Sequence, residues 1–377
     1  MHLFLALTVM TAGLITTTPQ VPTTPEYVPG RFVVESPEIP AEGVAAASIR
    51  DSRPGTVLGH RVIETAPVGD PVEQAASLSA RLGVAVSPMV MYRMLGEPVD
   101  EPLFADQWAL RNTGQAGGTS GADIDVVPAW QWSRGVGTVM AVIDSGVDPT
   151  SPELVGSLWQ NSGEVAGNGV DDDGNGFVDD RWGWDFVDGV GEPVDSVGHG
   201  TAVASVVAAR SDGFGMTGVA PGASIMAVRA CASFGCPADA VAEAIVYAAD
   251  NGADVINISL GAPGVEPLVT AAVAHALERG VLVVAAAGNN GNDLDASGPW
   301  TPVSIEGVLG VAWTTGDDLA AAGTNYGSGN VDLAAPGDLI LTADLDGGHS
   351  PRSGTSFAAP HVAGVAALML SLVPELT

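Results

Sequence analysis

The feature that most constrains this fold is a series of apolar runs, rich in β-branched residues, that alternate with alanine-rich stretches. The apolar runs lie at 139–144, 253–260, 281–289 and 308–313, and two alanine-rich stretches lie at 199–210 and 239–252. Continuous apolar strands separated by helices are typical of a parallel sheet that helices cover on both faces. We therefore expect an α/β domain over residues 102–377, with a mostly parallel, doubly wound sheet.

The residues before this domain follow another pattern. The apolar stretch Leu3 to Ile15 is too short to span a bilayer but has the length of a signal-peptide core, so we expect a signal peptide at 1–20 and a Thr/Pro-rich linker at 21–29. Residues 30–98 then have the pattern of a small α+β domain. Its expected strands are 31–36, 60–66 and 84–95, and its expected helices are 40–49 and 72–83.

The charge balance excludes some classes of partner. The chain has 44 acidic residues against 13 basic ones, all of them arginine, and a net charge of −31. Nucleic acids and anionic membrane surfaces bind basic patches, so neither is an expected partner. The acidic balance favours solubility instead.

Cysteine is sparse, with only Cys231 and Cys236 in the chain. In an exported protein such a pair can form a local disulfide, and the alternative is two buried thiols. No Cys-x-x-Cys pair or Cys/His cluster indicates a zinc site.

Three segments offer the groups that serine catalysis needs. Asp144 ends an apolar run, His199 begins an alanine-rich stretch, and Ser356 follows a Gly-Thr turn in the first turn of a predicted helix. A serine in that place lies among unpaired N–H groups, near the positive end of the helix dipole. Singly, these residues are common as a helix cap, a turn residue and a loop residue. Together they supply the hydroxyl, the imidazole and the carboxylate of a catalytic triad.

The sequences around these residues are D-S-G, H-G-T and G-T-S-F-A-A-P-H-V-A-G. They resemble the three signature blocks of the subtilase (subtilisin-like) serine peptidases, in the same chain order. The resemblance covers residues 102–377 and implies an endopeptidase that works through an acyl-enzyme without a catalytic cofactor. It implies that Asp144 orients His199, that His199 acts as general base and then general acid, and that Ser356 attacks the peptide carbonyl.

Two further blocks extend the resemblance. Asn289 matches the side-chain donor of the family's oxyanion hole, with the backbone N–H of Ser356 as the second donor. Ser259, Leu260 and Gly261 match the strand along which the peptide substrate pairs. The alternative interpretations are a turn-forming asparagine and an ordinary strand end.

An acidic segment between Asp144 and His199 has the spacing of an EF-hand loop through its ninth position. The twelfth position is Trp182 instead of glutamate, so the motif is incomplete. Similar insertions in subtilases are calcium sites, and the alternative is a solvated acidic loop. The expected Ca²⁺ ligands are Asp171, Asp173, Asn175, the carbonyl of Phe177, and Asp179, with Asp180 and Asp185 as possible substitutes.

The segment 30–98 resembles a subtilase propeptide, which acts as an intramolecular inhibitor and folding chaperone. Residues 100–115 resemble the start of a mature enzyme, which places self-cleavage between about Leu95 and Leu103. The expected protein is therefore a secreted zymogen that cleaves proteins or peptides.

Other interpretations remain open at this point. One alternative is a catalytically impaired subtilase-like module that binds partners or serves as a scaffold. Another is an incomplete fragment, because the sequence ends 21 residues after Ser356, and we expect either a longer natural product or marginal stability. Of the other histidines, His361 is expected to be structural, and His349 has no evident partner in the sequence.

Overall fold

The computed structural model of this chain describes residues 27–34, 51–54, 61–66, 69–90 and 101–376. The contacts divide the chain into a smaller unit, Ala12–Gly96, and a larger unit that contains Glu97–Thr377. The predicted signal peptide at 1–20 and the predicted helix at 40–49 lie outside the described residues.

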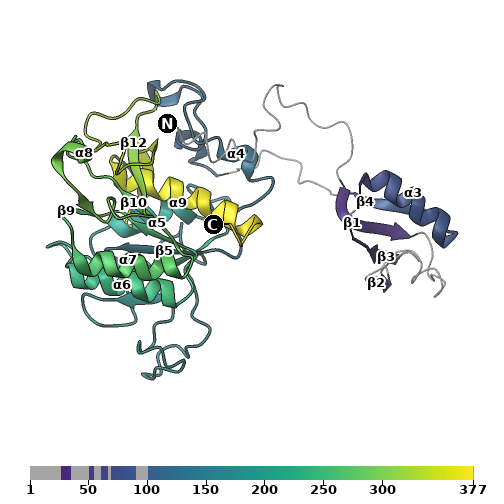
Figure 1. Cartoon of the computed structure of the whole chain (residues 1–377), viewed down its shortest axis with the longest axis horizontal. Helices are drawn as coiled ribbons and strands as arrows, with labels where there is room; N and C mark the ends of the chain where they lie inside the picture. The colour runs from purple at the N-terminus through teal and green to yellow at the C-terminus, as the bar shows by residue number, and fades with distance from the viewer. Residues whose placement is uncertain (1–26, 35–50, 55–60, 67–68, 91–100, 377) are drawn as a thin grey trace. The chain divides into compact units, whose positions relative to one another are not determined.

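The smaller unit is a four-stranded antiparallel sheet with one described helix (Figure 1). Its strand order is β2-β3-β1-β4. Strand β1 begins inside the expected linker, and β2 was not predicted from the sequence. The elements are β1 (Tyr27–Val34), β2 (Asp51–Pro54), β3 (Arg61–Glu64), α3 (Pro71–Leu82) and β4 (Val86–Val90).

Local sequence signals account for α3. The carboxylate of Asp70 accepts hydrogen bonds from the N–H groups of Val72 (2.8 Å) and Glu73 (3.1 Å), and so caps the first turn. Gly83 ends the helix with a φ of 67°, which glycine adopts without strain. The apolar face of α3 packs with Phe32 and Ile63 of the sheet, so this unit has a core of its own.

The larger unit contains a seven-stranded sheet in the order β13-β12-β10-β8-β5-β7-β6, and all its neighbouring strands are parallel. The expected α/β fold with a parallel sheet is confirmed. The strands are β5 (Val139–Asp144), β6 (Gly183–Asp185), β7 (Ser224–Arg229), β8 (Val255–Ile258), β10 (Leu282–Ala286), β12 (Leu309–Thr314) and β13 (Leu333–Pro336).

Helices cover both faces of this sheet (Figure 1). Helices α5 (His199–Ala208) and α9 (Thr355–Leu372) contribute to one hydrophobic cluster, and α6 (Ala238–Asp250) and α7 (Pro267–Glu278) contribute to the other. Because both faces are buried, the strands have no polar face, which explains their continuous apolar sequences.

Among the described residues, one helix, α9, is long and apolar enough to cross a membrane by length and composition. In the structure 67% of that stretch is buried, and it packs against the sheet as a core helix.

A disulfide lies close to the end of β5. The N–H groups of Ala230 and Cys231 both donate to the carbonyl of Asp144, and Cys231 forms a disulfide with Cys236. The disulfide alternative is therefore the correct one.

Shorter elements complete the larger unit. They are η1 (Phe104–Asp106), η2 (Gln115–Gly117), α4 (Val126–Ala129), β9 (Ala262–Pro263), α8 (Leu294–Ser297), β11 (Trp300–Thr301), β14 (Ile340–Ala343) and β15 (His349–Arg352).

Candidate active site

The candidate site lies where parallel strands end and two helices begin. Strand β5 ends at Asp144, α5 begins at His199, and Ser356 is the second residue of α9. In parallel α/β sheets the carboxyl ends of the strands meet at one edge, where ligands bind. The fold thus gathers residues that are far apart in the sequence.

Asp144 and His199 form a close pair. Nδ1 of His199 lies 2.8 Å from Oδ1 and 2.9 Å from Oδ2 of Asp144, whose side chain is buried. The N–H of Ser145 also donates to Oδ1, at 2.7 Å. A carboxylate that accepts at Nδ1 keeps the proton on that nitrogen and leaves the lone pair on Nε2. This arrangement suits a general base.

Ser356 and Ser259 are joined by two reciprocal hydrogen bonds. The Ser356 hydroxyl donates to the Ser259 carbonyl (3.1 Å), and the Ser259 hydroxyl donates to the Ser356 carbonyl (2.8 Å). The second bond has a local cause, because Pro360, four residues further along α9, has no N–H to offer that carbonyl.

His199 lies next to the first turn of α9. Its ring centroid is 5.7 Å from that of Phe357, the residue after Ser356. In this structure the Ser356 hydroxyl donates to the Ser259 carbonyl. To donate to His199, as a triad requires, it must first rotate about χ1. Catalytic hydrogen bonds are often formed only once a substrate is bound.

Two hydrogen-bond donors lie beside Ser356. Oδ1 of Asn289 accepts from the N–H (2.8 Å) and the hydroxyl (3.0 Å) of Thr355, which fixes the amide and leaves Nδ2 without an acceptor among the described residues. The N–H of Ser356 is in the first turn of α9, where no intrahelical acceptor exists. Together they can hold a negatively charged oxygen.

A buried carboxylate that sequence reasoning missed supports the Asp144–His199 pair. Asp195 accepts from the Ser145 hydroxyl (2.8 Å), from the N–H of Gly198 (2.8 Å), and from both the N–H and the hydroxyl of Thr201. It therefore caps α5 and links that helix to the end of β5. The sequence offers little signal for this role, because Asp195 precedes the first residue of α5 by four positions and the capping position itself is Gly198.

The surroundings of His199 set the pH at which it becomes neutral. Burial by itself lowers the pKa of His199, but the charge and the hydrogen bonds of Asp144 raise it, and the net pKa lies above the usual value for histidine. Arg352 opposes this increase and Asp195 adds to it. The Arg352 guanidinium lies close to the start of α5, because its Nη2 is 3.9 Å from the point where a Cβ of Gly198, the residue before His199, would be.

These charges predict the pH dependence of activity. A general base must be neutral, so kcat/KM is expected to fall with decreasing pH already above the usual histidine range, near 6.5. Replacing Arg352 by glutamine removes a positive charge that lowers the pKa of His199, so the fall in kcat/KM should begin at higher pH. The expected change is about two- to threefold in the apparent ionisation constant of His199. Profiles of kcat/KM from pH 5 to 9 test this. Arg279→Gln, which alters a partly exposed ion pair with Asp250, is the matched control, and identical profiles for all three proteins would contradict it.

The acidic segment brings three carboxylates together. Oxygens of Glu164, Asp173 and Asp180 all lie within 4.8 Å of one another. Asp180 is fully buried, burial raises its pKa, and the Tyr247 hydroxyl donates to it at 2.6 Å. The amide of Asn161 donates to both Asp173 and Asp180, each at 2.8 Å. Hard oxygen donors of this kind suit Ca²⁺.

The structure brings one of the predicted calcium ligands, Asp173, into this group. The Asp171 carboxylate accepts from the N–H groups of the following turn, and that of Asp179 accepts from those of residues 168 and 169. The Asn175 amide donates to Asp180 (3.0 Å), and the Phe177 ring packs on Tyr247. Glu164 was missed because it precedes the motif by seven residues.

Asp185, one of the possible substitutes, is not part of this group of carboxylates. It forms a buried ion pair with Arg229 instead.

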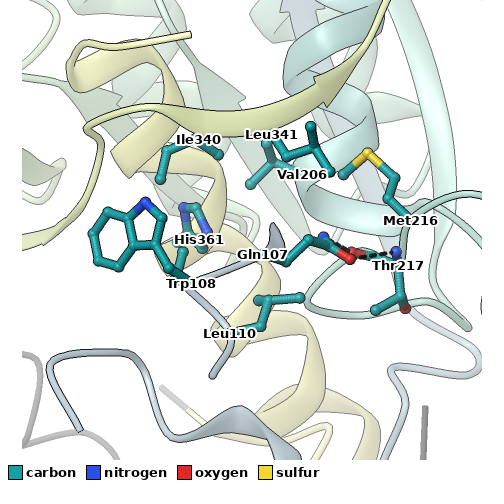
Figure 2. Close-up of a pocket in the computed structure, with 10 residues that line it drawn as sticks. Gln107, Trp108, Leu110, Val206, Met216, Thr217, Ile340, Leu341 and His361 are labelled. Atoms are coloured by element: carbon teal, nitrogen blue, oxygen red, sulfur yellow. Dashed lines mark hydrogen bonds between the residues drawn. The ribbon is translucent and has the colours of Figure 1, made fainter. Parts of the chain in front are cut away.

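Two other histidines that the structure describes, His361 and His349, lie away from this site. His361 lies buried beside a small cavity of about 10 Å³, with Trp108 and Ile340 nearby (Figure 2). Burial lowers the pKa of His361 to about 4, so the ring is neutral, and its Nδ1 is 2.7 Å from the carbonyl of Phe357. His349, which has no evident partner in the sequence, lies 2.6 Å from the buried carboxylate of Glu153.

Comparisons with known proteins identify the class. The sequence profile of the subtilase family matches residues 135–377, and the chain belongs to this family of serine endopeptidases. A solved protease from Pseudoalteromonas arctica PAMC 21717 is similar with a TM-score of 0.60 and 30% identity, over 74% of this chain and 88% of that one.

Relatives similar to this chain include a serine proteinase and an extracellular protease. A thermophilic serine proteinase of Bacillus sp. (strain AK1) is 40% identical over 64% of this chain and 55% of its own length. Thermitase of Thermoactinomyces vulgaris is 39% identical over 66% of this chain and 80% of its own. An extracellular protease of Xanthomonas campestris pv. campestris is 35% identical over 72% of this chain and 49% of its own length. The chain thus spans about half the length of two of these relatives.

Proposed function

We propose that this protein is a secreted serine endopeptidase that cleaves peptide bonds with Asp144, His199 and Ser356 as its triad. The observation that carries the proposal is the buried Asp144–His199 pair, which lies beside the helix start that bears Ser356, and Asn289 is hydrogen-bonded to that same helix start. A histidine oriented by a carboxylate at Nδ1 and a serine within reach of it define nucleophilic catalysis.

In this mechanism, Nε2 of His199 accepts the proton of the Ser356 hydroxyl as Oγ attacks the peptide carbonyl. The oxygen of the tetrahedral intermediate is held by Nδ2 of Asn289 and the N–H of Ser356. His199 then donates that proton to the leaving amine, and the C–N bond breaks to give an acyl-enzyme. Water, deprotonated by His199, hydrolyses the ester and restores the serine.

The segment Ser259–Leu260–Gly261 is the proposed binding edge for the peptide backbone. It continues β8, a central strand, beyond the sheet, and the Ser259 carbonyl receives the Ser356 hydroxyl. Gly261 is exposed, so a substrate backbone can approach it closely.

The smaller unit is the proposed propeptide, over residues 30–98, with self-cleavage between about Leu95 and Leu103. Its support is a separate core and a compact sheet-and-helix fold. Secretion is supported by the apolar N-terminal stretch, by the Cys231–Cys236 disulfide, which is typical of oxidising compartments, and by the extracellular relative.

A structural Ca²⁺ is proposed at Glu164, Asp173 and Asp180. The fit rests on Asp180, a fully buried carboxylate that forms no described ion pair and lies beside two further carboxylates. A bound divalent cation would offset this concentration of negative charge and connect the acidic segment to α6 through Tyr247.

Chelation should therefore destabilise the protein. A cation present at about 100 times its Kd adds about 2.7 kcal/mol, which corresponds to about 5–10 °C in Tm for a domain of this size. Calorimetry with calcium and with excess EGTA measures the difference. Asp173→Asn should reduce it, and Glu278→Gln, an exposed change on α7, should not. An unchanged Tm under chelation would remove the proposed site.

The function itself is tested with a fluorophosphonate probe, which reacts only with an activated serine. Mass mapping should find the label on the peptide that contains Ser356, and a new N-terminus between residues 95 and 103. A folded protein that is neither labelled nor processed would instead fit the scaffold alternative.

A further inference from the structure

The β14–β15 hairpin leads into the helix that bears Ser356 and reaches the proposed general base. Strand β15 ends at Arg352, four residues before Ser356. Nη2 of Arg352 and Cγ of Leu345 lie 3.9 Å and 3.4 Å from the point where a Cβ of Gly198 would be. Gly198 is the residue before His199, so a shift of this hairpin would change the charge beside the base.

The hairpin depends on the rest of the unit for its position. Its strands form a separate two-stranded sheet, in which Ile340 pairs with Arg352 and Ala343 with His349. An isolated hairpin is at best marginally stable in water. The N–H of Ala343 donates to the Ser205 hydroxyl of α5 at 3.0 Å, which holds the end of β14. The start of β15 is held by another contact.

That contact is the pair formed by His349 and Glu153. Nε2 of His349 is 2.6 Å from Oε1 of Glu153, and the two side chains are 16% and 2% exposed. The main chain fixes Glu153, because its carbonyl accepts from the N–H of Arg210 (3.0 Å) and its carboxylate from that of Met216 (3.3 Å). A Cβ on Gly215 would lie 1.7 Å from Oε1, so backbone closes this side of the carboxylate.

The pair should resist separation. Among the described residues, His349 supplies the one side chain that donates to the Glu153 carboxylate. Burial raises the pKa of Glu153, the bonds from His349 and Met216 oppose that increase, and the charge of Asp212 adds to it. A buried carboxylate that lost its partner would cost free energy, so the bond to Glu153 fixes the first residue of β15.

Within the hairpin, Asp344 orients the arginine. Its Oδ1 accepts from Nη2 of Arg352 and from the Ser350 hydroxyl, each at 2.8 Å. Nε of Arg352 is buried and has no acceptor in the part of the chain that the structure describes. Burial raises the pKa of Asp344, but Arg352, Ser350 and the charge of His349 lower it below its usual value. The guanidinium is thus attached to the hairpin and moves with it.

Three charged side chains act on His199. Burial lowers the pKa of His199, Asp144 and Asp195 raise it, and Arg352 lowers it. Asp144 ends β5 and Asp195 is bonded to the start of α5, whereas Arg352 belongs to the hairpin. A displaced hairpin would therefore remove the positive charge and leave both negative charges in place.

We propose that His349 is a positioning residue, whose bond to Glu153 anchors the β14–β15 hairpin and keeps Arg352 beside His199. The inference rests on the proposed peptidase function and adds a residue that sets the pH at which the enzyme works. Without the anchor, Arg352 no longer opposes protonation of the base. The acid limb of kcat/KM then lies at higher pH.

The test is a double-mutant cycle of His349→Ala and Arg352→Gln, with the acid limb of kcat/KM for a peptide p-nitroanilide as readout. His349→Ala should move the limb to higher pH, by about twofold in the apparent ionisation constant of His199. In the Arg352→Gln background the same change should move it no further, because the charge has already gone. A direct effect of any charge on His349 would persist in that background.

Further variants keep the test decisive. His349→Gln, whose amide can still donate to Glu153, should leave the limb at its wild-type position. His275→Ala, which breaks another histidine–carboxylate pair, with Asp250 at 2.8 Å, is the matched control and should not move it. If His349→Ala does not fold, His349→Ala with Glu153→Leu takes its place, because no carboxylate then remains buried.

Three results would overturn the inference: a limb that loss of the anchor does not move, an equal shift in the Arg352→Gln background, or a shift in His349→Gln as large as that in His349→Ala. The fluorophosphonate probe separates this failure from failure of the function. A labelled wild type with any of these results refutes the role of His349 alone, and an unlabelled, folded wild type refutes the peptidase proposal.

Discussion

Ser356→Ala is expected to lose peptide hydrolysis almost completely and to remain as an unprocessed chain. The variant lacks the oxygen that forms the acyl-enzyme, and the neighbouring residues cannot replace it. The size of this effect in subtilisin, about 10⁶-fold in turnover, is the expected loss here. Hydrolysis of a p-nitroanilide and the N-terminal sequence of the purified protein give the two readouts.

A conservative serine change elsewhere provides the control for Ser356→Ala. Ser297 is exposed at the end of α8, and Ser297→Ala should be processed and active like the wild type. The Tm of Ser356→Ala should stay near that of an unprocessed wild type. If this variant kept more than about a thousandth of the activity, Ser356 would not be the nucleophile.

Asp144→Asn is expected to lower kcat by about 10⁴-fold, an effect known from other triad enzymes. An amide in this place no longer fixes the proton on Nδ1 of His199, so the histidine presents the wrong nitrogen to the serine. The change also removes the charge that raises the pKa of His199, and the residual activity should therefore persist to lower pH than in the wild type.

These two consequences of Asp144→Asn are measured separately, as kcat at the pH optimum and as the acid limb of kcat/KM. Asp148→Asn, four residues further along and partly exposed, is the matched control and should change neither. A variant within tenfold of wild-type turnover would show that Asp144 does not orient the base.

Features that depend on local pattern were predictable from the sequence. Apolar strands such as β5 and β10 have no polar face because helices cover both sides, and this composition alone indicates a buried parallel sheet. Asp144, His199 and Ser356 were identified because each follows or begins an element with clear boundary residues. Asp144 and His199 then form a hydrogen-bonded pair in the structure.

Contacts between residues that are far apart in the sequence were not predictable. Asp195 lies four positions before the first residue of α5, and only folding places it against Ser145 at the end of β5. Glu164 joins Asp173 and Asp180 because the acidic segment turns back on itself, which its spacing does not encode. The pairing of His349 with Glu153 likewise joins residues 196 positions apart. Strand β2 was missed because Asp51–Pro54 lacks an alternating apolar pattern.

The reciprocal hydrogen bonds between Ser259 and Ser356 bear on how this protein should respond to heat. Ser259, which is proposed to hold the substrate backbone, and Ser356, which is proposed to attack the peptide, each donate a hydrogen bond to the main-chain carbonyl of the other. Ser259 follows β8 and Ser356 belongs to α9, and both elements contribute to the hydrophobic core. Softening of surface loops therefore leaves their alignment intact. Thermal inactivation should coincide with melting of the core and should not precede it.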